Sequence, residues 1–399
     1  MSPVSPLPAL ACLLVAMATA YLLGKKFGVP SALGRFNSID GLRGYLAFFV
    51  FLHHASVWYF YLQTGKWALP PSNLYTQFGH SSVFLFFMIT GFLFFSKLID
   101  GRTQTIDWGK LFVSRLLRLA PLYLFFIFLL FLLIAYLSNG KLNVSSLQLL
   151  TSMASWLSFT ILGTPTINGI GGIALASVAG ATWSLPYEWL FYLALPLLAL
   201  TVKTKPPLPY IALSIVGITS LIIWGTPFRP FILIPFLSGI ATALLARSSA
   251  FCLFSARRLA TYIALGCIAI TVIVYPSALN PAPLFLLTVA FSLIACGNNL
   301  FGLLTSPVSR TLGEMAYSVY LLHGITLFVT FKFILGINAS KALSPVIYWT
   351  ALLGVTPTLI CICFTTFHFI EGPAMRSSSK VTVWLRSLTQ KLKCIIKTA

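Results

Sequence analysis

Negative charge is scarce in this sequence, in which 399 residues include only 6 Asp and Glu and charged side chains of all kinds make up 8%. Soluble proteins average about 25% charged residues, so the composition excludes ordinary soluble domains. The 58% of hydrophobic residues, with 34 Phe among them, instead suit spans of about 20 apolar residues joined by short loops. The composition therefore predicts an all-α, polytopic transmembrane helical bundle.

Because acidic residues are so few, the 26 Lys and Arg give the chain a formal net charge of +20. A basic chain could bind nucleic acid, but this sequence lacks a polar basic face and any RNA-binding motif, so we expect no nucleic-acid partner. The positive-inside rule accounts for most of the excess. Some of the same residues could also bind a phosphorylated substrate.

Metal-binding and nucleophile motifs are also lacking. The seven cysteines lie mostly in apolar runs and show neither a zinc-binding spacing nor a disulfide framework. No nucleophile elbow is present either. We therefore expect no metal site.

Eleven apolar segments are candidate membrane spans. The first, 8–23, has no basic residue before it and Lys25 and Lys26 after it, so we expect an uncleaved span rather than a signal peptide. The other ten are 42–62, 78–98, 118–138, 187–202, 208–225, 230–246, 259–276, 282–298, 313–335 and 346–370. Segment 147–164 contains several Ser and Thr and is marginal in length. We expect it to be a re-entrant or interfacial helix on the outer side, because a full crossing would invert everything after it.

The basic residues indicate how these spans are oriented. With the N-terminus outside, most of them fall on inner loops, and those left outside are Lys66, Lys141, Arg229, Lys332 and Lys341. The same count puts the C-terminus in the cytoplasm. From Lys380 onward, apolar and basic residues alternate as in an amphipathic helix lying on the inner leaflet.

Ionisable side chains inside spans are costly and are functional hypotheses by default. Arg43 opens the 42–62 span, and His53 and His54 lie in its interior. Arg43 and His54 are eleven residues apart, about 16 Å and close to three turns along a helix, so they share a face while His53 points elsewhere. A hydrogen-bonded core histidine is the alternative interpretation.

Four further side chains stand out in the other spans. Arg115 and Arg118 share a helix face, and their guanidinium forks suit phosphate, although they could also be a plain topology signal. Glu188 follows Pro186 in the first turn of the 187–202 span, at its outer mouth, where a helix-start carboxylate is the alternative. His323 lies inside an apolar helix and could equally be a core histidine. His80 and His368 are interpreted as interfacial residues.

Together these segments resemble the acyltransferase-3 family of integral-membrane O-acyltransferases. In the N-terminal half, the resemblance rests on residues 39–44 with Arg43 and His54, on 83–92 with Thr90 where Ser is usual in the family, and on Arg115 and Arg118 before 121–123. Further along the chain it rests on 183–185 followed by Glu188, on Tyr317, Ser318 and His323, and on 369–373. It runs in order from about 38 to 374, and the family suggests ten spans, to which 8–23 adds an eleventh. We therefore divide the chain into an N-terminal transmembrane segment with a cytoplasmic linker (1–37), a membrane acyltransferase domain (38–374) and a basic amphipathic cytoplasmic tail (375–399).

The resemblance implies transfer of an acyl group, with acetyl expected, from acyl-CoA to a hydroxyl of a cell-surface sugar or lipid-linked saccharide in a bacterial inner membrane. The expected partners are acyl-CoA, the sugar or glycolipid acceptor and membrane lipids, with no bound cofactor. Arg43, Arg115 and Arg118 would bind the CoA phosphates at the cytoplasmic face.

His54 would be the general base or a covalent acyl relay. Glu188 at the opposite face would orient the acceptor or His54, and Asp40 would position Arg43. Further substrate-binding positions implied by the motifs are His323, Trp183, Ser184 and Tyr317.

Two other classes of protein fit a polytopic chain with polar intramembrane residues. A transporter or flippase would line a substrate path with them, although the two halves of this sequence show no inverted repeat. A sugar-lipid polymerase is a further alternative. A protein that moved its lipid-linked substrate without modifying it would favour these classes over the enzyme.

Overall fold

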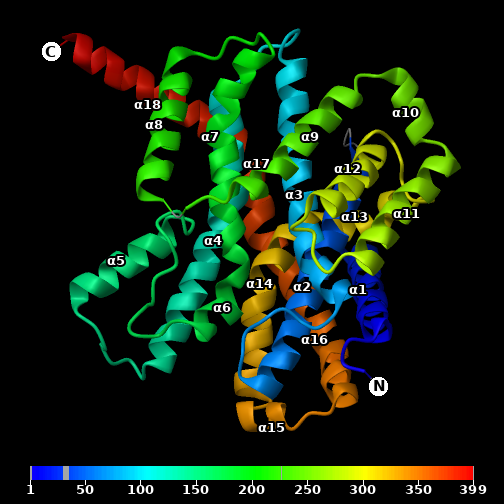
Figure 1. Cartoon of the computed structure of the whole chain (residues 1–399). Coiled ribbons are helices and arrows are strands. Elements are labelled where there is room, and N and C mark those ends of the chain that lie inside the picture. Colours follow the sequence, from blue (N-terminus) through cyan, green and yellow to red (C-terminus); the bar gives the residue numbers. More distant parts are fainter. Residues whose placement is uncertain (1, 30–35, 226, 399) are drawn as a thin grey trace.

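The computed structural model describes residues 2–29, 36–225 and 227–398, and all named elements within these ranges are helices (Figure 1). The prediction of an all-α bundle is therefore confirmed. Residues 30–35, part of the expected cytoplasmic linker, lie outside the described residues.

Six helices in the described ranges are long and apolar enough to cross a membrane. They are α1 (Pro6–Phe27), α2 (Asn37–Thr64), α3 (Asn73–Asp100), α4 (Trp108–Leu137), α14 (Ala316–Val329) with η4 (Thr330–Ile334), and α16 (Pro345–Thr366) with η5 (Phe367–Glu371) and α17 (Gly372–Arg376). A seventh candidate joins η2 (Pro230–Leu233) and α9 (Ile234–Leu245) to α10 (Ser249–Ser255) across a bend of 107°. The molecule is thus a multi-pass membrane protein.

Each of the eleven expected spans coincides with a helix. Beyond the six or seven above, these helices are α7 (Leu185–Thr201), α8 (Leu208–Trp224), α11 (Arg258–Val274) and α12 (Pro281–Ala295). That these four helices cross the bilayer completely stays a prediction. The remaining elements are α5 (Ser146–Leu157), α6 (Ile173–Ala179), η1 (Gly180–Ser184), η3 (Leu303–Thr305), α13 (Pro307–Glu314), α15 (Ile337–Lys341) and α18 (Ser378–Thr398).

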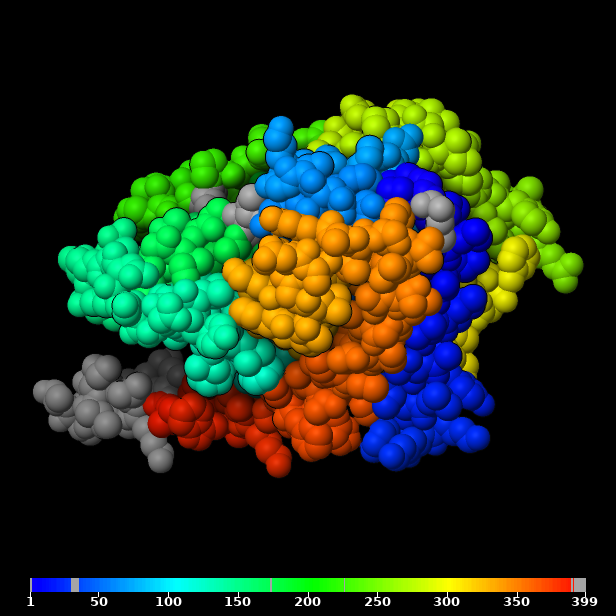
Figure 2. Space-filling view, turned by 90° about the horizontal axis from the view of Figure 1, so that it is seen from below, coloured from blue at the N-terminus to red at the C-terminus, as the bar shows by residue number. Residues whose placement is uncertain are grey.

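Segment 147–164 folds mainly as α5, which has 12 residues. A helix of that length extends about 18 Å, less than the ~30 Å of a hydrocarbon core. On length alone it is therefore too short to be a span. The face seen from below in Figure 2 includes α5 in teal, the blue loop between α2 and α3, and α15 in light orange.

Helix α2 lies at the centre of the bundle, and α3, α13 and α14 pack around it. Small residues allow close helix crossings, as between α3 and α9. A Cβ atom added to Gly91 would lie 2.3 Å from the carbonyl oxygen of Phe236, and one added to Gly239 would lie 2.2 Å from that of Met88. Only glycine permits backbones to approach so closely, as is common between membrane helices.

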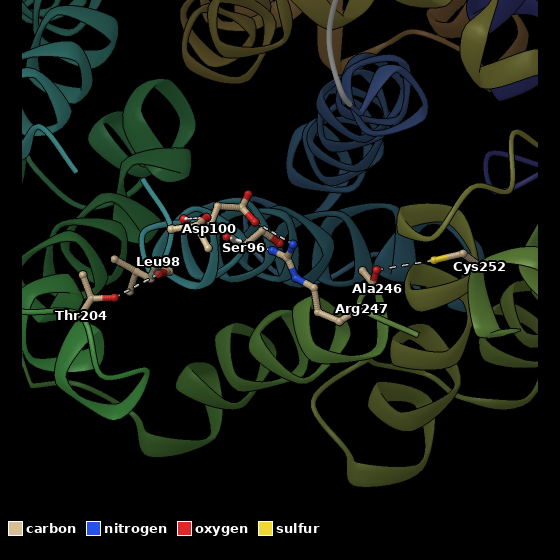
Figure 3. A network of polar contacts seen from close by, with 8 residues as sticks. Ser96, Leu98, Asp100, Thr204, Ala246, Arg247 and Cys252 are labelled. Carbon is tan, nitrogen blue, oxygen red and sulfur yellow. Dashed lines mark hydrogen bonds and ion pairs between the residues drawn. The ribbon is translucent and has the colours of Figure 1, made fainter. Parts of the chain in front are cut away.

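A polar network fixes the C-terminal end of α3 (Figure 3). Arg247, which follows α9, pairs with the Asp100 carboxylate at 2.7 Å and donates to the Ser96 carbonyl oxygen at 3.0 Å. Thr204, after α7, donates to the Leu98 carbonyl oxygen. These bonds join α3 to the bend between α9 and α10 and to the turn between α7 and α8.

The C-terminal tail forms α18, which packs against α4 and projects beyond the bundle (Figure 1). Arg386 of α18 pairs with Asp107, the residue that caps the N-terminus of α4. Val383, Trp384 and Leu385 are exposed apolar residues of this helix. An exposed apolar stripe suits contact with a leaflet, which stays a prediction for this tail.

Candidate functional site

Two cavities inside the bundle meet at shared residues. The histidine cavity has a volume of about 450 Å³ and the arginine cavity one of about 290 Å³. Polar and aromatic residues lining the histidine cavity include His53, His54, His80, Trp183, Tyr187 and Arg229. Those lining the arginine cavity include Asp40, Arg43, Arg115, Arg118, Glu188 and Tyr192. Val83 of α3 and Tyr320 of α14 line both, and we call this pair the neck.

His54 is held in one orientation by two contacts of its Nδ1 atom, which lies 3.0 Å from the Val50 carbonyl oxygen and 3.0 Å from Nε2 of His323. His323 Nδ1 in turn lies 3.0 Å from the Val319 carbonyl oxygen. A carbonyl oxygen only accepts, so each Nδ1 is the donor and Nε2 of His323 is an acceptor. Within the described residues Nε2 of His54 has no hydrogen-bond partner, and in this tautomer it keeps its lone pair.

His53 also lines the histidine cavity, although it was expected to point elsewhere. Its Nδ1 lies 2.8 Å from the Tyr75 carbonyl oxygen, and its ring packs against Gly79, where an added Cβ would approach within 2.7 Å. His80, interpreted from sequence as interfacial, lines the same cavity and lies 2.8 Å from the Ser277 hydroxyl. The described residues contain no group of His, Cys, Asp and Glu that could hold a metal ion.

Arginines from two helices meet in the arginine cavity, Arg43 from α2 and Arg115 and Arg118 from α4. The Arg43 guanidinium lies 3.9 Å from the carboxylate of Asp40, one turn earlier. Three arginines against the carboxylates of Asp40 and Glu188 leave a positive excess. The cavity therefore suits an anionic ligand such as a phosphate group, which guanidinium forks bind bidentately.

The expected position of Glu188, at the face opposite the arginines, is wrong. Glu188 lines the arginine cavity and accepts a hydrogen bond from Tyr192, one turn further along α7. The reason is that α7 begins within the bundle rather than at its surface. Pro186 in its first turn lines the histidine cavity, so Glu188, two residues on, already lies past the neck.

The other expected substrate-binding residues divide between the cavities. Trp183 lines the histidine cavity, whereas Ser184 and Tyr317 line the arginine cavity. His323 is not among the residues that line either cavity, and its ring contacts His54 instead.

Sequence reasoning missed Tyr320 as well as His80. The Tyr320 hydroxyl lies 2.8 Å from the Ser184 hydroxyl and donates to the Ala181 carbonyl oxygen at 2.9 Å. Tyr320 is one tyrosine among several in an apolar helix, and no sequence signal distinguishes it. His80 could have been identified from the sequence. It precedes Val83 by three residues and Thr90 by ten, and this spacing places all three on one face of α3.

Comparison with known proteins gives one family and one relative. The model of the family described as an acyltransferase domain matches residues 36–368. Nodulation protein 10 of Rhizobium leguminosarum bv. viciae is 29% identical over 176 residues, which make up 41% of this chain and 44% of that protein. The aligned region thus spans less than half the length of this relative. No solved structure matches the chain.

Proposed function

The chain belongs to the acyltransferase-3 family of membrane acyltransferases, and from this premise we propose that it transfers an acetyl group from acetyl-CoA to a hydroxyl of a cell-surface sugar or lipid-linked saccharide. One observation carries the proposal: a cavity rich in arginine and a cavity containing an unprotonated histidine nitrogen meet at Val83 and Tyr320. A two-substrate transfer needs such an arrangement, because each substrate has its own cavity and the reacting ends meet at the neck.

The arginine cavity is proposed to hold the phosphates of the donor. Arg43, Arg115 and Arg118 supply three guanidinium forks, and Asp40 holds the first of them. Arg43 and His54 lie on one helix, about 16 Å apart along its axis. A donor whose phosphates lie at Arg43 would therefore direct its long pantetheine arm and thioester through the neck toward His54.

His54 is proposed as the general base. Its Nε2 takes the proton of the acceptor hydroxyl while the hydroxyl oxygen bonds to the thioester carbonyl carbon. The C–S bond then breaks, and the imidazolium returns the proton to the CoA thiolate. His323 is proposed as a positioning residue, because its ring keeps the His54 proton on Nδ1 and the lone pair on Nε2.

A covalent relay is the second route at the same atom. Here Nε2 of His54 attacks the thioester carbonyl, CoA leaves, and the acceptor hydroxyl then takes the acyl group from the imidazole. The two routes differ in one measurable respect. In a single turnover the relay releases CoA before any acceptor is added, whereas the general base releases CoA only with an acceptor.

We further propose that the arginine cavity faces the cytoplasm and the histidine cavity the outer side of a bacterial inner membrane, with the C-terminus inside. The distribution of Lys and Arg over the loops supports this orientation. Residues 38–374 would then form the catalytic membrane domain, and the amphipathic tail would lie on the inner leaflet.

Two cavities that meet at a neck would also serve a transporter or flippase, the alternative function. Purified protein, acetyl-CoA and candidate saccharide acceptors distinguish the two. The enzyme is supported if CoA thiol appears in step with acetylated acceptor, identified by its mass. Movement of a lipid-linked saccharide across a vesicle membrane, without any acetylated product or CoA release, would contradict it. Mass analysis of surface polysaccharide from a deletion strain would then identify the acceptor.

A further inference from the structure

A third cavity, which we call the lysine cavity, opens between the C-terminal end of α3 and the beginning of α4, and its volume is about 450 Å³. Polar side chains that line it include Ser96, Lys97, Gln104, Thr105, Lys110 and Ser114. Leu93 lines both this cavity and the arginine cavity. The two cavities are therefore neighbours with a common wall residue.

The lysine cavity is positively charged once its ion pairs are taken into account. Its two carboxylates, Asp100 and Asp107, are paired with Arg247 and Arg386, which come from outside the cavity lining. These ion pairs neutralise the two carboxylates, so the ammonium groups of Lys97 and Lys110 give the cavity its net positive charge. These two lysines come from different helices, α3 and α4, so a phosphate between them could contact both.

One face of α3 connects all three cavities. Val83 lies at the neck, Thr90 in the arginine cavity and Lys97 in the lysine cavity, and successive members are seven residues, or two turns, apart. The 14 residues from Val83 to Lys97 cover about 21 Å along the helix axis. A ligand lying along this face would have its far end at Lys97 when its reactive end is at the neck.

We propose that the lysine cavity binds the adenosine end of coenzyme A, with Lys97 and Lys110 at its 3′-phosphate. Gln104, Thr105 and Ser114 supply polar side chains for the ribose and adenine. The inference rests on the proposed use of acyl-CoA and adds a reason for that donor. An acyl phosphate lacks a nucleotide that could fill this cavity.

Equilibrium binding of CoA and of 3′-dephospho-CoA to the purified full-length protein tests the proposal without knowledge of the acceptor. The parent protein should bind CoA about tenfold more tightly, as expected for one charge-assisted contact. The double variant Lys97→Gln/Lys110→Gln should bind both ligands alike, at the affinity of the parent for 3′-dephospho-CoA. Lys205→Gln is the matched control, since this exposed lysine is not among the cavity-lining residues, and it should keep the preference.

Equal affinity of the parent protein for the two ligands would overturn the lysine cavity as the 3′-phosphate site. So would a double variant that keeps the tenfold preference. Either outcome leaves CoA binding in the arginine cavity, and with it the proposed function, intact. Failure of the parent protein to bind either ligand would instead overturn the donor and this inference together.

Discussion

Nε2 of His323 lies 3.0 Å from Nδ1 of His54, and this contact couples the protonation of one ring to that of the other. Because His323 donates from Nδ1 to the Val319 carbonyl oxygen, its Nε2 can only accept. His54 must therefore carry its proton on Nδ1. Together with the Val50 carbonyl oxygen, the second histidine thus determines which nitrogen of the first is available for chemistry.

Replacing His323 tests this coupling. His323→Leu removes the acceptor and should lower kcat about tenfold, the effect of one lost hydrogen bond, with KM for acetyl-CoA unchanged. His323→Gln should retain most of the activity, because its amide oxygen can still accept from His54. Steady-state kinetics of both variants provide the comparison. A rise in KM with unchanged kcat would instead make His323 a substrate-binding residue.

Substitution of the arginine pair on α4 distinguishes a phosphate-binding site from a topology signal. Arg115→Lys/Arg118→Lys keeps both charges but loses the bidentate forks, so KM for acetyl-CoA should rise about tenfold while KM for the acceptor changes little. Arg258→Lys, at an exposed position of α11, is the control and should leave both values unchanged. An unchanged KM for the donor in the double variant would leave the two arginines with a role in topology alone.

The rate of acyl transfer should be sensitive to the size of the side chains at the neck. Val83→Phe enlarges a side chain that lines both cavities and should lower transfer by about two orders of magnitude, because it displaces the reacting groups. The same substitution at the exposed Val216 of α8 should have no effect. Full activity in Val83→Phe would show that the acyl group does not pass between the two cavities here.

The crossing of α3 and α9 predicts a stability difference between two glycines. Gly239→Ala places a Cβ atom 2.2 Å from the Met88 carbonyl oxygen, and the helices must separate, at a cost of about 1–3 kcal/mol. Gly266→Ala meets nothing within 4 Å and should be neutral or stabilising by up to about 1 kcal/mol. Thermal unfolding in detergent should therefore give a lower Tm for Gly239→Ala and an unchanged or higher Tm for Gly266→Ala, and equal decreases would contradict the close packing.

Hydrophobicity predicted the helices better than it predicted their depth. All eleven expected spans coincide with helices, since long apolar runs leave the backbone no other way to satisfy its hydrogen bonds in lipid. Glu188 was assigned to the wrong end because hydropathy shows where a helix begins in sequence, not where that residue lies across the bilayer. The η1 turn and the start of α7 lie inside the bundle, and only tertiary packing determines this.

The candidate site was most readily predicted where an ionisable side chain stands in an apolar span. Arg43, Arg115 and Arg118 stand out in an apolar chain, and the structure brings all three into one cavity. Tyr320 and the contact between His323 and His54 depend on how α14 packs against α2. The two histidines are 269 residues apart, and no local pattern joins them.

His54 is the residue at which both proposed routes of acyl transfer take place. His54→Ala should reduce acetyl transfer about 10²–10⁴-fold, the contribution typical of a general base, with expression and CoA binding unchanged. His53→Ala is the matched control from the neighbouring position in the same cavity, and it should be tolerated better. The decisive measurement is the amount of acetylated acceptor formed by the purified parent protein and by each variant. We expect a large loss for His54→Ala alone, and acetylation by His54→Ala at the rate of the parent protein would contradict both the general base and the covalent relay.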